Sequence, residues 1–345
     1  MKKEFSEKFR YVGFIMTCAM VLYHCPHIDN YYALSPLDAF VNSLFDSGIK
    51  TLGVLIMSWF FSATGFLLFR GYSMENYPEK IKRRVFSLLL PYLAWQLIIV
   101  LIDALQGQYD FVLTDFLTKT FLLEIWPIDG PLWYVYAVFL LAVLSPPLFF
   151  LLKRKKLFAW AAILALILLT EACKNINAPA VRNIVEYGYI GNILTYIPAY
   201  LVGAFFGYYH NEDSSPDLYL VLSLLLMALL LNSVSDGFFY YASLQMLPIA
   251  ALYLLPSFPV LHGRKIYRLS FLIYAMHLPL ITDLWSPVLG FYMNTVGRLT
   301  MAASIGSITT NLMLLAADIT LAALVYAVLS RIMPRLLALL TGGRA

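Results

Sequence analysis

The residues best suited to chemistry in this sequence are two histidines inside long apolar stretches. His24 ends the stretch YVGFIMTCAMVLYH, and His277 lies within SFLIYAMHLPL. A titratable side chain in hydrocarbon is costly and therefore marks a functional site by default. Because imidazole titrates near neutral pH, we expect His24 to act as a general base on a hydroxyl group and His277 to line or orient the same catalytic site. The alternative for His24 is an interfacial histidine that hydrogen-bonds water or lipid headgroups.

A cationic side chain precedes the first histidine on the same apolar stretch. Arg10 comes 14 residues before His24. At about 100° per residue this spacing places the two on nearly the same helix face, about 21 Å apart along the axis. They cannot touch, but they can line one passage. We therefore expect an anionic donor to be held near Arg10 and a hydroxyl acceptor to be presented near His24.

A second basic group lies at the start of another apolar stretch, in KIKRRVFSLLLPYLAW. It contains Lys80, Lys82, Arg83 and Arg84. Guanidinium groups offer planar forks to phosphate oxygens and lysine adds point charge, so this run is suited to a coenzyme A–type nucleotide or an anionic lipid headgroup. The alternative is a topology anchor without a ligand.

Two further patterns concern helix packing. Ser270, Tyr274 and His277 repeat at i, i+4 and i+7, which predicts one polar stripe that faces protein or water. For Ser270 and Tyr274 we prefer interhelical hydrogen bonding to a catalytic role. A second stripe of small residues, which includes Ser62 and Gly65, predicts close contact with a neighbouring helix.

The three cysteines show no C-x-x-C spacing, so we expect no disulfide framework and no metal site.

The composition determines which elements must position these residues. The chain has 345 residues, of which 61% are hydrophobic and only 13% charged, and this excludes an ordinary soluble domain. Its apolar runs are too long and unbroken for barrel strands, so we expect an all-α, polytopic membrane helix bundle that forms a single domain over residues 1–345. The expected spans, about ten in number, are 11–27, 49–70, 85–105, 131–152, 157–173, 189–208, 217–233, 241–261, 269–292 and 307–333.

The positions of the lysines and arginines predict the orientation of these spans. When ten spans alternate from an inside N-terminus, 19 of the 24 cations fall on the cytoplasmic side. The other five are Lys50, Lys119, Lys174, Arg182 and Arg298. This bias follows the positive-inside rule and predicts that both termini lie inside.

Four segments, taken in order, resemble the acyltransferase-3 family of integral-membrane acyltransferases. They are the first span ending in VLYH, the pair FFSATGFLLF and KIKRRVFSLLLPYLAW, the segment GPLWYVYAVFLL, and RKIYRLSFLIYAMHLPLI. The resemblance covers nearly the whole chain in register. It implies a multi-pass protein of the cell membrane that transfers an acyl group, most often acetyl, from cytoplasmic acetyl-CoA to a hydroxyl of a surface polysaccharide or lipid-linked glycan.

The resemblance also implies roles for individual residues. The first-span histidine of the family corresponds to His24, its late-helix histidine to His277, and its cytoplasmic basic motif to Lys82, Arg83 and Arg84. One position departs from the pattern, because the family usually has an arginine 11 residues before the first histidine and this chain has Gly13. Arg10 lies one turn earlier and is the candidate replacement as a donor-binding residue.

Two other functions fit the same residues. A transporter or flippase, for a glycan-linked lipid or a small anionic solute, would use the same residues along its passage. Such proteins often carry a repeated half with matching helix breaks, and no such pairing is visible here. The departure at Gly13 also allows a membrane partner without catalytic activity. The expected partners are an acyl-CoA donor, a glycan acceptor and the lipid bilayer, with no nucleic acid.

Overall fold

The computed structural model of the protein describes residues 3–25, 36–105, 107, 112–121, 127–175, 189–209, 218–234, 240–292 and 303–344. All regular secondary structure in these residues is helical, which confirms the expected all-α class. The physical reason is that a segment in hydrocarbon must satisfy its own backbone N–H and C=O groups, and a helix does so within one stretch of chain.

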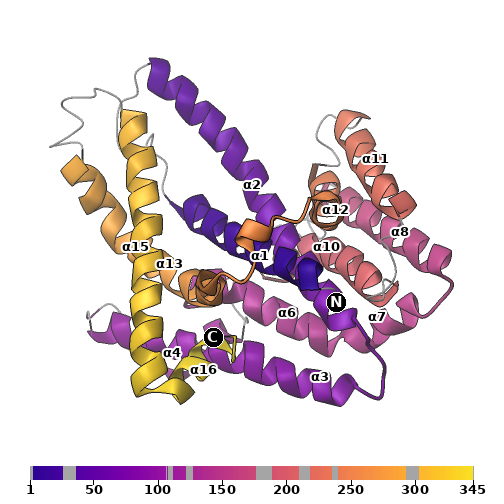
Figure 1. Cartoon of the computed structure of the whole chain (residues 1–345), viewed down its shortest axis with the longest axis horizontal. Coiled ribbons are helices and arrows are strands. Elements are labelled where there is room, and N and C mark those ends of the chain that lie inside the picture. Colours follow the sequence, from indigo (N-terminus) through magenta and orange to yellow (C-terminus); the bar gives the residue numbers. More distant parts are fainter. Residues whose placement is uncertain are drawn as a thin grey trace.

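The helices follow the apolar stretches of the sequence, and each of the ten expected ranges overlaps a helix or a pair of consecutive helices (Figure 1). Their bounds are α1 Lys3–His24, α2 Pro36–Phe69, α3 Tyr77–Arg84, α4 Leu90–Leu105, α5 Leu113–Thr120, α6 Trp133–Val143, α7 Ser145–Leu152, α8 Lys156–Asn175, α10 Tyr189–Tyr209, α11 Leu218–Val234, α12 Tyr240–Leu254, α13 Ser270–Tyr292, α15 Ala303–Ile332 and α16 Pro334–Thr341. A π-helical turn, Val85–Leu89, joins α3 to α4.

Four helical segments in the described residues are long and apolar enough to cross a membrane. They are Thr51–Phe69, Tyr77–Leu105, Lys156–Cys173 and Ile308–Ile332. A fifth span is formed if Gly130–Val143 and Ser145–Leu152 are counted together, although they meet at a bend of 60°. The bend coincides with two consecutive prolines, which lack an N–H and clash with the preceding turn. The protein is thus a membrane protein by its helices, whereas the count of ten spans and their orientation stay predictions.

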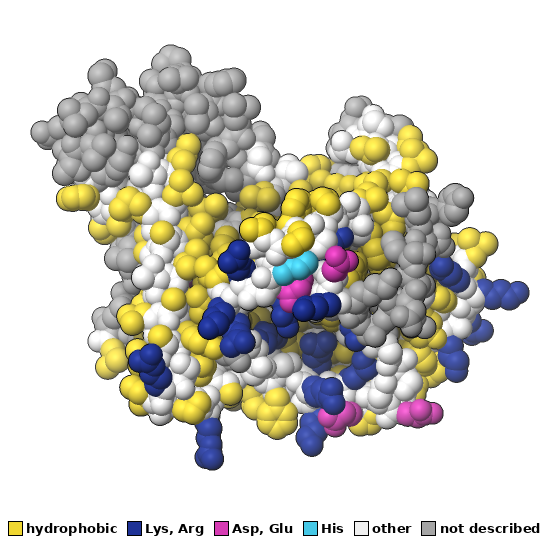
Figure 2. Space-filling view, viewed as in Figure 1, with side chains coloured by type: hydrophobic (Ala, Val, Ile, Leu, Met, Phe, Trp, Pro, Cys, Tyr) yellow, Lys and Arg dark blue, Asp and Glu magenta, His cyan; other side chains and the backbone are white. Residues whose placement is uncertain are grey.

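The charged side chains are unevenly distributed over the surface. Figure 2 shows lysine and arginine gathered mainly in the lower half of one face, and hydrophobic side chains over much of the remaining coloured surface. Within the bundle, α1 packs against both α2 and α13. This arrangement brings together the first and the late apolar stretches, each of which carries one of the two histidines.

Helices α2 and α10 pack closely against each other through glycines. A Cβ atom added at Gly203 would lie 1.9 Å from the Ser62 carbonyl oxygen, and one at Gly65 would lie 2.2 Å from the Tyr200 carbonyl oxygen. The Ser62 hydroxyl also donates a hydrogen bond of 2.9 Å to the Ala199 carbonyl oxygen. The small-residue stripe therefore has the packing role expected from the sequence.

We expect Gly203→Ala to destabilise the protein by roughly 1–3 kcal/mol, because the two helix backbones must move apart to admit the methyl group. The measurement is the thermal unfolding midpoint of the detergent-solubilised protein. Gly48→Ala is the matched control, since a Cβ at this helical position of α2 meets nothing within 4 Å. Equal midpoints for the two variants would contradict the close contact between α2 and α10.

Candidate functional site

Two adjacent cavities lie inside the bundle, and Tyr274 lines both. The first, which we call the arginine cavity, has a volume of ≈ 240 Å³, and its polar lining residues include Thr17, Thr64, Arg84, Tyr134, Ser270 and Arg344. The second, the histidine cavity, has a volume of ≈ 600 Å³, and its lining residues include Tyr23, His24, Trp133, Tyr196, Tyr240 and Leu278. Tyr274 thus lies at the boundary between a cationic compartment and one that contains a histidine.

The two histidines predicted from the sequence meet beside the histidine cavity. The ring centroids of His24 and His277 lie 5.0 Å apart, with an angle of 47° between the rings. His277 is fully buried, whereas His24 lines the cavity. His24 is therefore the histidine that a bound substrate can reach, and the buried ring of His277 packs against it.

One hydrogen bond assigns the proton on His277. Its Nδ1 atom lies 2.7 Å from the Tyr274 carbonyl oxygen, which can only accept, so we assign Nδ1 as the donor. The Nε2 atom is then left as an acceptor, and it has no hydrogen-bond partner in the described part of the chain. This buried Nε2 atom lies on a ring next to the His24 imidazole, and a buried acceptor without a partner is suited to orient that imidazole.

The polar stripe on α13 forms the expected hydrogen bond to another element at Tyr274, whereas the bond of Ser270 is local. The Tyr274 hydroxyl donates to the Pro131 carbonyl oxygen in the short turn before α6, which is the interhelical hydrogen bonding expected from the sequence. Ser270 donates to the Tyr267 carbonyl oxygen of the preceding turn, at 2.9 Å. Both side chains also line the arginine cavity, so this face of α13 borders polar space as well as protein.

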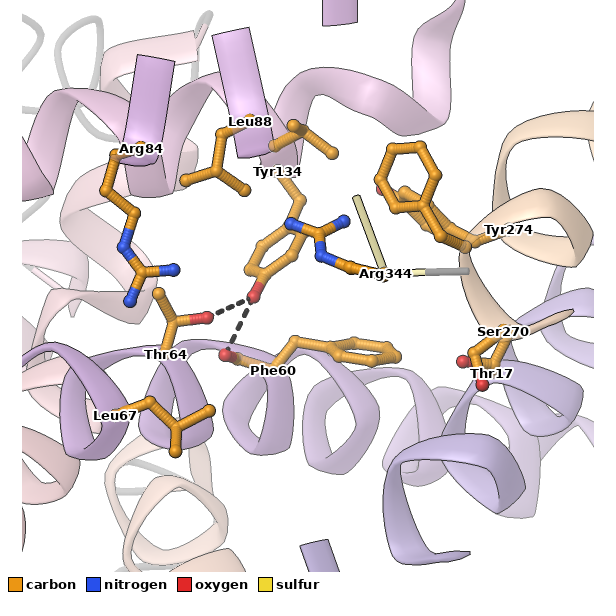
Figure 3. A pocket seen from close by; sticks show the side chains of 12 residues that line it. Thr17, Phe60, Thr64, Leu67, Arg84, Leu88, Tyr134, Ser270, Tyr274 and Arg344 are labelled. Carbon is orange, nitrogen blue, oxygen red and sulfur yellow. Dashed lines mark hydrogen bonds between the residues drawn. The ribbon is translucent and has the colours of Figure 1, made fainter. Parts of the chain in front are cut away.

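In the basic run, Arg84 points toward the interior. It lines the arginine cavity, and Figure 3 shows Arg84 and Arg344 on either side of Tyr134. The Tyr134 hydroxyl donates 2.8 Å to the Phe60 carbonyl oxygen and lies 2.6 Å from the Thr64 hydroxyl. These two bonds hold the phenol in place between the guanidinium groups.

The other members of this run have different surroundings. Lys82 and Arg83 are exposed, and Arg83 forms an ion pair with Glu79 at 3.0 Å. Lys80 donates to the carbonyl oxygens of Leu68 and Arg70 at the end of α2, where a cation stabilises a helix C-terminus. The structure thus distinguishes Arg84 from its neighbours as the residue that borders a cavity.

Arg10 lies away from the lining of both cavities. Its guanidinium pairs with Glu7 at 3.0 Å, and its side chain is 62% exposed. Gly13 is one turn from Thr17, whose hydroxyl donates 2.9 Å to the Gly13 carbonyl oxygen and which lines the arginine cavity. The contact of Arg10 with the donor stays a prediction. The positive charge of the arginine cavity comes from Arg84 and Arg344.

Sequence reasoning assigned no functional role to Arg344. This residue follows α16, and its Nη2 atom donates 2.8 Å to the Ser87 carbonyl oxygen in the π-helical turn. Its guanidinium also lies 4.7 Å from the centre of the Phe271 ring. Desolvation, together with the charge of Arg84, lowers the pKa of Arg344 to about 10, so it stays charged at neutral pH, and the residue keeps an exposed side toward solvent.

Fold and site together define an integral-membrane protein with a cationic cavity next to a histidine pair. The acyltransferase-3 family model, described as "Acyltransferase domain", matches residues 11–330. The chain therefore belongs to this family, as the resemblance predicted, and is a membrane acyltransferase. No curated protein and no solved structure shows a significant match to it.

Proposed function

We propose that the protein is an O-acetyltransferase of the cell membrane. It takes acetyl from cytoplasmic acetyl-CoA and transfers it to a hydroxyl group of an extracytoplasmic polysaccharide or lipid-linked glycan. The observation that carries the proposal is the position of Tyr274, which borders both a cavity with two arginines and a cavity with a histidine. Arginines suit the phosphates of a nucleotide donor, and the histidine suits activation of a hydroxyl.

The reaction requires one proton transfer and one exchange of bonds. In this mechanism His24 accepts the proton of the acceptor hydroxyl while its oxygen attacks the thioester carbon. The new C–O bond forms, the C–S bond breaks, and the coenzyme A thiolate then takes the proton back from His24. His277 packs against His24 at a ring distance of 5.0 Å and orients it for this exchange.

The test is transfer of labelled acetyl by purified protein in sealed vesicles, with acetyl-CoA on one side and a glycan acceptor on the other. We expect label on the acceptor, together with thermal stabilisation of the solubilised protein by coenzyme A. Passage of unmodified acceptor across the bilayer, without label and without stabilisation, would instead support a transporter or flippase. Bound coenzyme A without turnover would identify a partner that lacks activity.

A further inference from the structure

The segment after α15 folds back into the protein and is held there by specific contacts. Leu337 and Leu340 of α16 are buried, and the Trp95 indole N–H of α4 donates 3.0 Å to the Leu340 carbonyl oxygen. Helix α16 is therefore fixed against α4. Its last residues are directed toward the π-helical turn at the start of that helix.

Two glycines after α16 make the approach of Arg344 possible. Gly342 and Gly343 have φ angles of +62° and +69°, a conformation that glycine adopts without strain. The Gly343 N–H donates 2.8 Å to the Ala338 carbonyl oxygen and ends the helix. A Cβ atom at Gly342 would lie 2.4 Å from the Ser87 carbonyl oxygen. The backbone thus passes very close to this turn and delivers Arg344 into the arginine cavity.

The charges in the arginine cavity are not balanced by protein carboxylates. Within the described residues, neither Arg84 nor Arg344 forms an ion pair, and the cavity lining contains no aspartate or glutamate. Two cations that share a cavity repel each other, and an anion between them removes this cost. The hydroxyl groups of Thr17 and Ser270 already donate to backbone carbonyl oxygens, so the two guanidinium groups are the donors that face an anion here.

We propose that Arg344 and Arg84 together form an anion site that binds a phosphate group of the acyl donor. The proposal rests on the proposed function for the identity of the donor, but the site itself rests on the two guanidinium groups. Arg84 comes from the run ahead of α4 and Arg344 from the segment after α16. The second cation of the donor site therefore comes from a part of the chain distant in sequence from the basic run.

The main test is coenzyme A binding to the purified full chain in phosphatidylcholine nanodiscs. We expect Arg344→Ala to weaken this binding about 10-fold or more, because a charged hydrogen-bond donor to phosphate is lost. Arg344→Lys should recover part of the loss, since it restores charge without the guanidinium fork. Arg335→Ala on the exposed face of α16 is the matched control and should bind as the wild type does.

Gly342→Ala provides a variant that keeps both arginines. We expect it to weaken coenzyme A binding as well, because the added methyl group displaces the segment that carries Arg344. The unfolding midpoint of each variant is measured in parallel. If Gly342→Ala weakens binding while Arg344→Ala does not, Arg344 has no role in the site and the proposal is wrong.

Two further measurements distinguish failure of the anion site from failure of the proposed function. Inorganic pyrophosphate is used as a probe that needs no acyl group, and its binding should also fall in Arg344→Ala. If pyrophosphate binding depends on Arg344 but the wild type transfers no acetyl, the anion site stands and the proposed function fails. If coenzyme A and pyrophosphate bind equally to the wild type and Arg344→Ala, the anion site fails whatever the activity.

The last arm distinguishes a donor phosphate from a lipid headgroup, which has the same chemistry. Phosphatidylglycerol is added to the nanodiscs, and coenzyme A binding is measured again. Unchanged affinity supports a site for the donor. Competition by phosphatidylglycerol in the wild type that disappears in Arg344→Ala would assign the site to a lipid and overturn the proposal.

Discussion

Replacement of His24 by alanine is expected to reduce acetyl transfer by about 10²–10⁴-fold, the range that removal of a general base typically gives. His24 is the histidine that lines the larger cavity, and removal of its imidazole leaves the acceptor hydroxyl without a base. Coenzyme A should still bind, because His24 is not part of the arginine cavity. The measurement is the rate of labelled acetyl transfer in vesicles, with ligand-induced thermal stabilisation measured on the same preparation.

Two other histidines provide comparisons for this experiment. His262, whose Nε2 atom lies 3.0 Å from the Ser257 hydroxyl, borders neither cavity, so His262→Ala should retain transfer. His277→Ala should lower the rate less than His24→Ala does, because it removes a residue that orients the base rather than the base itself. Full transfer by His24→Ala would refute the assignment of the base.

The longer helices of the fold could be predicted from the sequence, because each follows its own apolar stretch, whereas the short helices α3 and α16 were not expected. The partners of those elements could not. The stripe with Ser62 and Gly65 predicts a close helix contact, but only the structure shows that α10 and its Gly203 provide the other side. Helix pairing depends on shape complementarity between stretches far apart in the sequence, and no local pattern records it.

Only part of the candidate site could be predicted, because the contacts between its residues also depend on how the helices pair. Both histidines were identified as polar groups in apolar stretches, yet their contact follows from the packing of α1 against α13. In the basic run, Lys82, Arg83 and Arg84 are consecutive and point about 100° apart, so they cannot all face one cavity, and the structure selects Arg84. No motif around Arg344 marks a function, and its place beside Arg84 follows from the packing of α16 against α4.

The second large effect on activity is expected at Arg84, because this residue of the basic run lines the arginine cavity. Arg84→Gln is expected to raise the KM for acetyl-CoA about 100-fold, which corresponds to about 2.7 kcal/mol, while kcat changes little. Within the described residues the Arg84 guanidinium makes no hydrogen bond or ion pair with another protein group, so its donors are available to a ligand. Arg344 already donates to the Ser87 carbonyl oxygen, and its loss should therefore cost less.

Arg83→Gln is the matched control, because it removes the same charge one residue away. Its guanidinium is exposed and paired with Glu79, and an exposed pair of this kind contributes about 0–1 kcal/mol. If the basic run acted only through its total charge near the membrane, the two variants would raise KM equally. If Arg84 contacts the donor inside the cavity, as its position indicates, only Arg84→Gln will do so, and the effect will persist at high salt because a buried contact is weakly screened.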